Sequence, residues 1–237
     1  MSYLNKFQTH ADYANETFVA PNVSACVEDG HVHYMGFPKT NGYDYVDLGL
    51  PSGTLWATCN VGASSPEEYG DYYAWGEITP KQTYTNENYR FYPGNNTDVY
   101  TKYSQYDNKM LLDLEDDAAH VVMGGDWHMP TLAQLNEMLD NTTSSITTYN
   151  GFYGKLFTSK NNGNSIFFPY AGMYFETGLT YEGELFSIWS KTRYGNNIDA
   201  YVLDSMASST SSHIYYNRDG GLSVRGVIGE LADNFNR

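Results

Sequence analysis

The stretch GGDWHMPT, residues 124–131, opens the most clearly predicted element of this 237-residue chain. Its last residue, Thr131, is a good helix N-cap, because its hydroxyl can accept a hydrogen bond from an open amide of the first helical turn. Apolar residues then recur at helical spacing, which predicts one apolar face. The paired glycines permit the close backbone approach that the bulky Trp127 needs. The stretch therefore predicts a short amphipathic helix over 131–141, with strand-like sequence on both sides.

Short runs of β-branched and aromatic residues surround this helix. They predict strands at 55–61, 71–77, 154–159, 165–169, 185–190, 200–203, 213–216 and 222–227. A second short helix is expected over 113–120, and the polar, tyrosine-rich segment 79–108 is expected to be a long functional or mobile loop. One or two helices among many short strands indicate an α+β domain. Its rigid frame is expected to consist of Trp56, Trp75, Trp127 and Trp189.

The first 42 residues differ from the rest. Residues 18–27 and 30–35 predict a hairpin across Asp29-Gly30, a strong turn signal, but the segment before them is too polar to form a core of its own. We therefore divide the chain into an N-terminal arm over 1–42, used for attachment or oligomerisation, and a binding domain over 43–237.

The composition limits the partners. Thirteen Lys and Arg against 28 Asp and Glu give a net charge of −15 and a pI of 4.6, whereas nucleic acids and anionic membranes require cationic patches. No apolar run approaches the roughly 20 residues of a membrane span. The first residues lack the apolar centre of a signal peptide, so we expect synthesis in a cytosol. Tyrosine, with 23 residues, is common at binding surfaces. Cys26 and Cys59 are either free thiols or one disulfide.

Several motifs resemble the Fibrobacter succinogenes major paralogous domain, a family abundant in Bacteroidetes and their phages. They lie, in family order, at 46–50, 55–63, 70–77, 117–120, 124–131, 163–172, 188–190 and 222–227, so that the likeness covers roughly 43–230. The resemblance implies a C-type-lectin-like domain, in the version shared with formylglycine-generating enzymes and with the variable proteins of diversity-generating retroelements.

In those variable proteins, the ligand surface lies between a Trp-Ser strand and a terminal Val-Arg strand. The matching interval here is 191–221, in which Tyr can supply contact area while Ser and Asn supply adaptable hydrogen bonds. The resemblance implies a ligand-binding set of Arg193, Tyr194, Asn196, Asn197, Asp199, Tyr201, Ser208, Ser209, His213, Tyr215, Asn217 and Arg218. The alternative is that these are ordinary solvent-facing loop residues.

The arm also resembles the openings of structural proteins of Bacteroides phages, at 18–24 and 31–34. This resemblance implies that the arm attaches the protein to other virion proteins, in a head or tail fibre.

No motif for catalysis stands out. Formylglycine-generating relatives use a copper-binding cysteine pair in the C-terminal half, whereas Cys26 and Cys59 lie in the first quarter of this chain. None of the six histidines belongs to a recognisable nucleophile–base motif, and His128 is expected to be a hydrogen-bonded core residue. His31 and His33 share one strand face and would suit a metal if a third ligand converged; a solvated strand face is the alternative.

The acidic run over 113–117 offers the clustered carboxylates that Ca²⁺ prefers, but it does not match an EF-hand loop. Acidic residues at the start of a helix are the alternative. We therefore expect no cofactor other than this candidate Ca²⁺, and no enzymatic activity.

Together these features predict a non-catalytic surface protein of a phage virion, made in the host cytoplasm, that binds a host-surface glycan or protein. It is expected to be a homo-oligomer that is anchored by its arm, without membrane insertion. Two alternatives stay open: a purely structural capsid or fibre decoration protein, and a glycan-binding module on a bacterial cell surface.

Overall fold

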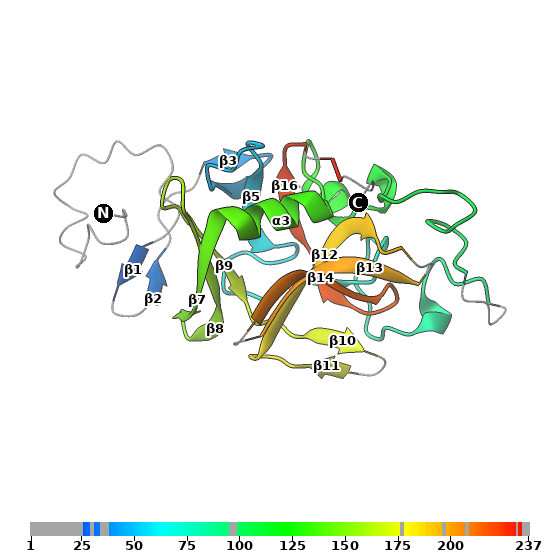
Figure 1. Cartoon of the computed structure of the whole chain (residues 1–237). Coiled ribbons are helices and arrows are strands. Elements are labelled where there is room, and N and C mark those ends of the chain that lie inside the picture. Colours follow the sequence, from blue (N-terminus) through cyan, green and yellow to red (C-terminus); the bar gives the residue numbers. More distant parts are fainter. Residues whose placement is uncertain are drawn as a thin grey trace.

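The computed structural model (Figure 1) describes residues 38–94, 99–175, 178–195, 198–206, 209–230 and 232–233, and only the backbone of 26–28, 31–33 and 211–213. This part of the chain is mostly β-strand with a few short helices, which is compatible with the predicted α+β class. None of the helices in these ranges has the length and apolarity needed to cross a membrane.

The described strands form several sheets. One has the order β14-β13-β12-β15-β6, made of β6 Tyr72–Tyr73, β12 Leu185–Arg193, β13 Asp199–Met206, β14 Ser209–Asn217 and β15 Leu222–Ser223. A second has the order β1-β2-β7-β8-β9, made of β1 Cys26–Glu28, β2 His31–His33, β7 Thr142–Tyr149, β8 Phe152–Ser159 and β9 Ser165–Pro169. A third has the order β16-β5-β4-β3, made of β3 Lys39–Thr40, β4 Tyr43–Asp47, β5 Leu55–Asn60 and β16 Arg225–Ile228. The strands β10 Met173–Phe175 and β11 Gly178–Thr180 form a pair.

Helix α3, Leu132–Asn141, begins where the sequence predicts it. The Thr131 hydroxyl accepts a hydrogen bond from the Gln134 N–H, and the Gln134 side chain accepts one from the Thr131 N–H at 2.9 Å, which makes a capping box. Leu135 and Met138 are completely buried. The helix packs against β12, β13 and β14 and leads directly into β7, so that it joins two sheets (Figure 1).

The other helices are short. The segment Asn86–Asn88 forms a 3-10 turn, η2. The helix expected over 113–120 is divided into a 3-10 turn, η3, at Leu114–Asp116 and a helix, α2, at Ala118–Met123.

All four tryptophans are completely buried, which confirms the predicted frame. The Trp75 indole N–H donates to the carbonyl of Ser190, and the Trp189 indole N–H donates to the carbonyl of Tyr73, each at 2.7 Å. These two bonds tie β12 to the segment around β6. They fix in place the strand from which the candidate site is built.

Two of the predicted strands differ from the structure. The expected strand over 222–227 is divided at Val224 into β15 and β16, which belong to different sheets. The expected strand over 71–77 is limited to β6, because the chain turns at Gly76, whose φ is +79°. A Cβ at this glycine would lie 2.7 Å from the ring of Phe91. The described ranges of the expected loop over 79–108, which are 79–94 and 99–108, are irregular apart from η2, as predicted, but they also contribute to the core. Their buried aromatic residues are Tyr84, Tyr89, Phe91, Tyr100 and Tyr103.

The predicted domain boundary at residue 43 is also wrong, since the chain already belongs to the domain at residue 38. Strand β3 pairs with β4, with Thr40 opposite Tyr43. The Trp127 indole N–H donates to the Thr40 carbonyl at 3.3 Å, and the Asn41 amide donates to the Met123 carbonyl.

Part of the predicted arm hairpin is confirmed. Strands β1 and β2 pair antiparallel, and β2 adds to the edge of β7 in parallel, with His31 opposite Thr148. Residues 18–25 of the expected first strand lie outside the described residues.

Candidate ligand-binding surface

Three of the predicted ligand-binding residues form one aromatic group, which we call the tyrosine cluster: Tyr194, Tyr201 and Tyr215. The rings of Tyr194 and Tyr215 are stacked, with centroids 3.9 Å apart and planes at 18°. The ring of Tyr201 stands edge-on to Tyr194 at 5.1 Å and 76°. Tyr215 is 45% exposed, while the other two are half-buried. The cluster therefore presents aromatic surface to solvent in a fixed arrangement.

Strand pairing explains why residues 21 positions apart or fewer meet here. Tyr201 of β13 lies directly opposite Tyr215 of β14, so both side chains project from the same face. Tyr194 follows the end of β12, and its N–H donates to the carbonyl of Asp199 at 3.1 Å. Within the interval 191–221, strands were expected only at 200–203 and 213–216, but β13 and β14 are longer and occupy most of it. Tyr201 and Tyr215 thus stand on a sheet, which holds side chains more rigidly than a loop does.

Arg218 was predicted to bind ligand, and this prediction is wrong because the side chain is completely buried. Its guanidinium donates to the Tyr103 and Lys102 carbonyls at 3.0 Å and to the Tyr89 hydroxyl at 3.1 Å. The guanidinium carbon also lies 4.5 Å from the ring centroid of Trp75. Arg218 therefore anchors the segment 79–108 to the core and cannot contact a ligand at the surface.

Arg193 and Asp199 are also wrong as ligand contacts, since each is only 5% exposed. The Arg193 N–H donates to the Met110 carbonyl at 2.7 Å, and its guanidinium lies 3.0 Å from the Met110 sulfur. Burial lowers the pKa of Arg193. Asp199 supports the tyrosine cluster through its backbone, because its carbonyl accepts a hydrogen bond from the Tyr194 N–H.

The remaining predicted residues divide into two groups. Ser209 and Asn217 are exposed at the two ends of β14. Asn196, Asn197 and Ser208 lie outside the described residues, as does the side chain of His213.

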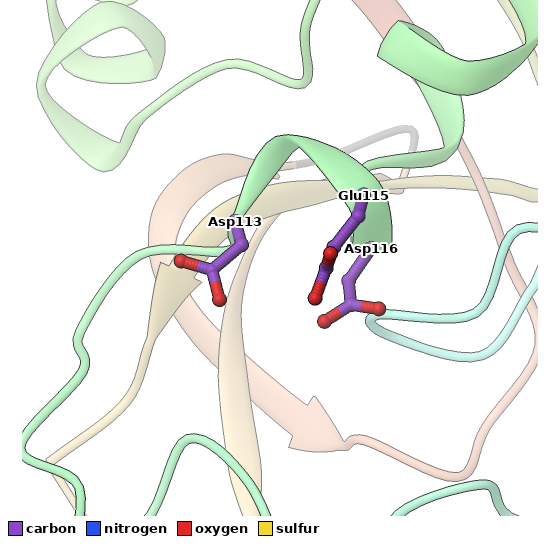
Figure 2. Close-up of side chains that lie close together, drawn as sticks. All are labelled: Asp113, Glu115 and Asp116. Atoms are coloured by element: carbon purple, nitrogen blue, oxygen red, sulfur yellow. The ribbon is translucent and has the colours of Figure 1, made fainter.

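Figure 2 shows three carboxylates that lie close together: Asp113, Glu115 and Asp116. One oxygen of each lies within 4.8 Å of the others. The Lys102 Nζ atom lies 2.9 Å from Asp113, 3.0 Å from Glu115 and 2.6 Å from Asp116. Asp116 is completely buried and also pairs with Arg90 at 2.6 Å. The protein thus supplies its own cations to this cluster.

This geometry changes the interpretation of the acidic run over 113–117. A Ca²⁺ ion would compete with the Lys102 ammonium for the same oxygen atoms. Hydrogen bonds from Lys109 and Lys102 lower the pKa of Asp113 to about 2, which keeps this carboxylate ionised. Asp117 is separate from it, because its carboxylate caps α2 and accepts from the His120 N–H at 3.0 Å. The cluster is best explained as an internal ion-pair network, and Asp117 fits the helix-start alternative.

Sequence patterns do not single out Lys155, yet its surroundings are unusual. Its side chain, on β8, is only 6% exposed, and Nζ donates to the hydroxyls of Ser205 at 3.0 Å and Thr210 at 2.6 Å. Burial lowers the pKa of Lys155. These bonds fasten the tip of the β13–β14 hairpin to the neighbouring sheet, while the tyrosine cluster lies toward the other end.

Two smaller expectations are confirmed. His128 is buried, with Nδ1 2.8 Å from the Met129 carbonyl and Nε2 3.0 Å from the Gly229 carbonyl, so it is a hydrogen-bonded core residue. Cys59 is a free thiol, and burial raises its pKa. The side chains of Cys26, His31 and His33 lie outside the described residues.

Comparison of the chain with models of protein families, with curated proteins and with solved structures found no match, so the resemblance to the Fibrobacter succinogenes major paralogous domain stays a prediction.

Proposed function

We propose that this protein is a non-catalytic recognition protein on the virion surface of a Bacteroidetes phage, and that its tyrosine cluster binds a neutral glycan on the host surface. The domain over 38–233 has the C-type-lectin fold in this proposal, and the segment before it attaches the protein to the virion. The motif resemblance supports the fold and the source. The observation that carries the binding function is the stacking of Tyr194 on the exposed Tyr215.

Exposed, prearranged aromatic rings suit a saccharide for a physical reason. The face of an aromatic ring carries partial negative charge, and the C–H groups on the flat side of a pyranose ring carry partial positive charge. The stacked pair already holds its rings in place, so little side-chain freedom is lost on binding. Asn217 is exposed two positions from Tyr215 on the same strand and can donate or accept hydrogen bonds from sugar hydroxyls.

The charge of the protein favours a neutral ligand over an anionic one. The chain carries a net charge of −15, and the cations nearest in sequence to the cluster are engaged internally: Arg193 and Arg218 are buried. Like-charge repulsion would slow and weaken the binding of an anionic polysaccharide, most strongly at low salt.

A glycan array, probed with the full chain, tests this function. We expect binding to neutral saccharides, and we expect Tyr215→Ala to weaken it by roughly 30-fold, since the loss of one central aromatic contact costs about 2 kcal/mol. Tyr106→Ala is the matched control, because Tyr106 is 80% exposed but is not part of the cluster. Equal binding by both variants and the wild type would remove the cluster from the site. Binding to host cells that disappears after protease treatment would indicate a protein ligand instead.

One observation favours the second candidate function, a purely structural decoration protein. The outer strand β14 is long and uncharged, as contacts between subunits often are. Imaging of the purified virion distinguishes the two functions: the tyrosine cluster faces solvent in a receptor-binding protein and is covered by a neighbouring subunit in a decoration protein.

A further inference from the structure

Strand β14 forms one outer edge of its sheet. Within the part of the chain that the structure describes, it pairs only with β13 (Figure 1). Its nine residues, STSSHIYYN over 209–217, include no Asp, Glu, Lys, Arg or Pro. Soluble proteins usually protect an exposed edge strand with a charged residue, a proline or a bulge. Here the register shift opposite Val202 and Asp204 leaves the stretch from Ile214 to Asn217 regular.

The backbone of this regular stretch can accept another strand. The Arg218 N–H donates to the Ile198 carbonyl at 2.9 Å, and this bond extends the register of Asn217 opposite Asp199. Hydrogen-bonded and non-hydrogen-bonded pairs alternate along antiparallel strands. It follows that the N–H and C=O groups of Asn217 and Tyr215 point away from β13, toward the open edge.

We propose that two copies of this chain pair antiparallel through β14, which joins their sheets into one continuous sheet. The charge distribution identifies the second copy as the partner. Two chains of net charge −15 repel each other over most of their surface, but contact along β14 brings no like charges together. An antiparallel pair of identical strands is also self-complementary, as a two-fold interface requires.

The pairing has a consequence for ligand binding, and this part rests on the proposed function. A two-fold axis between antiparallel strands of one sheet is perpendicular to that sheet, so both tyrosine clusters lie on the same face. The dimer therefore presents two clusters to one surface, and the binding of a multivalent glycan gains from effective concentration. The contact itself is short compared with a standard interface of about 1,600 Å², so we expect dissociation in the micromolar range.

The test measures the mass of the full chain by sedimentation between about 1 and 100 μM. We expect the mass to rise with concentration from 26.7 kDa toward twice that value. Ile214→Lys should abolish this rise, because Ile214 is 37% exposed on the paired stretch and the substitution places two lysines close together across the axis. Ile146→Lys is the matched control, since Ile146 is 45% exposed on the uncharged strand β7, and it should dimerise like the wild type.

Hydrogen exchange of the wild type supplies a measurement that needs no variant. The amides of Tyr215 and Asn217 should exchange more slowly at 100 μM than at 1 μM. Three results would overturn the pairing through β14. The wild type stays monomeric at 100 μM, Ile214→Lys dimerises like the wild type, or Ile146→Lys loses dimerisation as fully as Ile214→Lys does. Binding of a monovalent saccharide should be unchanged in Ile214→Lys. Whether Tyr215→Ala loses the binding of a monovalent saccharide tests the proposed function separately. The two proposals can therefore fail independently.

Discussion

The role of Arg218 leads to the most quantitative prediction. The variant Arg218→Ala removes the guanidinium from a completely buried position and leaves the carbonyls of Lys102 and Tyr103 without these donors. Each buried acceptor that loses its partner costs about 1–3 kcal/mol. The loss of the cation–π contacts of Arg218 adds to this cost.

 The closest rings to the Arg218 guanidinium carbon are those of Trp75, with its centroid at 4.5 Å, and Tyr100, with its centroid at 4.8 Å. Part of the loss is offset, because the variant no longer has to bury a charge.

The net destabilisation should be about 4 kcal/mol, the middle of the range for two buried carbonyls that each lose a donor. For a chain of this length, each kcal/mol shifts the melting temperature by about 2–4 °C, so we expect a fall of roughly 8–16 °C. Thermal unfolding followed by near-ultraviolet circular dichroism measures this shift. Limited proteolysis should also cut the variant within 79–108, because Arg218 anchors that segment through Tyr89, Lys102 and Tyr103.

Arg218→Lys and Tyr215→Ala serve as comparisons. Arg218→Lys keeps the positive charge but loses the planar guanidinium with its fixed N–H donors. The melting temperature of this variant should therefore lie between those of the wild type and Arg218→Ala. Tyr215→Ala should melt close to the wild type, because that side chain is 45% exposed. If Arg218→Ala melted within 2 °C of the wild type but no longer bound ligand, Arg218 would belong to the ligand surface and the reasoning from burial would fail.

Three further predictions concern other parts of the fold. Gly154→Ala should destabilise the protein by about 1–3 kcal/mol in urea unfolding, because a Cβ there would lie 2.3 Å from the Phe167 ring; an unchanged midpoint would mean that β8 and β9 can move apart. Burial raises the pKa of Tyr84 to about 12, so the folded state keeps a proton that the unfolded state loses near pH 10. Stability should therefore fall as the pH rises above 10, and spectrophotometric titration should show tyrosines that ionise only on unfolding; ionisation of all tyrosines near pH 10 in the folded protein would contradict this. Lys102→Met should lower stability by about 2–3 kcal/mol, because it leaves the buried Asp116 with fewer cationic partners. Added Ca²⁺ should raise the melting temperature of this variant more than that of the wild type, and an equal effect on both would show that Lys102 does not compete with the ion.

The sequence alone predicted those helices and strands whose start, end and apolar face are all encoded by residues close together in the chain. The helix α3 was predictable because its cap, Thr131, and its apolar face lie within a few residues of each other. The strands β5, β8 and β9 were predictable for a similar reason, since runs of β-branched and aromatic residues end at turn residues. The burial of the four tryptophans follows from the size of their apolar surface.

The segment 79–108 shows where local patterns fail. Its polar, tyrosine-rich sequence is typical of an exposed loop, but Tyr89 and Tyr103 contact Arg218, which lies more than a hundred positions away. A tyrosine can be buried when its hydroxyl finds a partner, and that partner is known only when the chain is folded. The expected strand over 71–77 failed similarly, because Gly76 turns the chain against Phe91.

The candidate site was likewise predictable from the sequence only in part. Sequence placed Tyr194, Tyr201 and Tyr215 in one interval, but could not separate them from Arg218 in the same interval. The pairing of β13 with β14 decides this, because residues opposite each other share a face while the chain beyond the strand turns into the core. Composition and periodicity report on neighbours along the chain. Which polar side chains face solvent depends on contacts between distant segments, and those exist only in the tertiary structure.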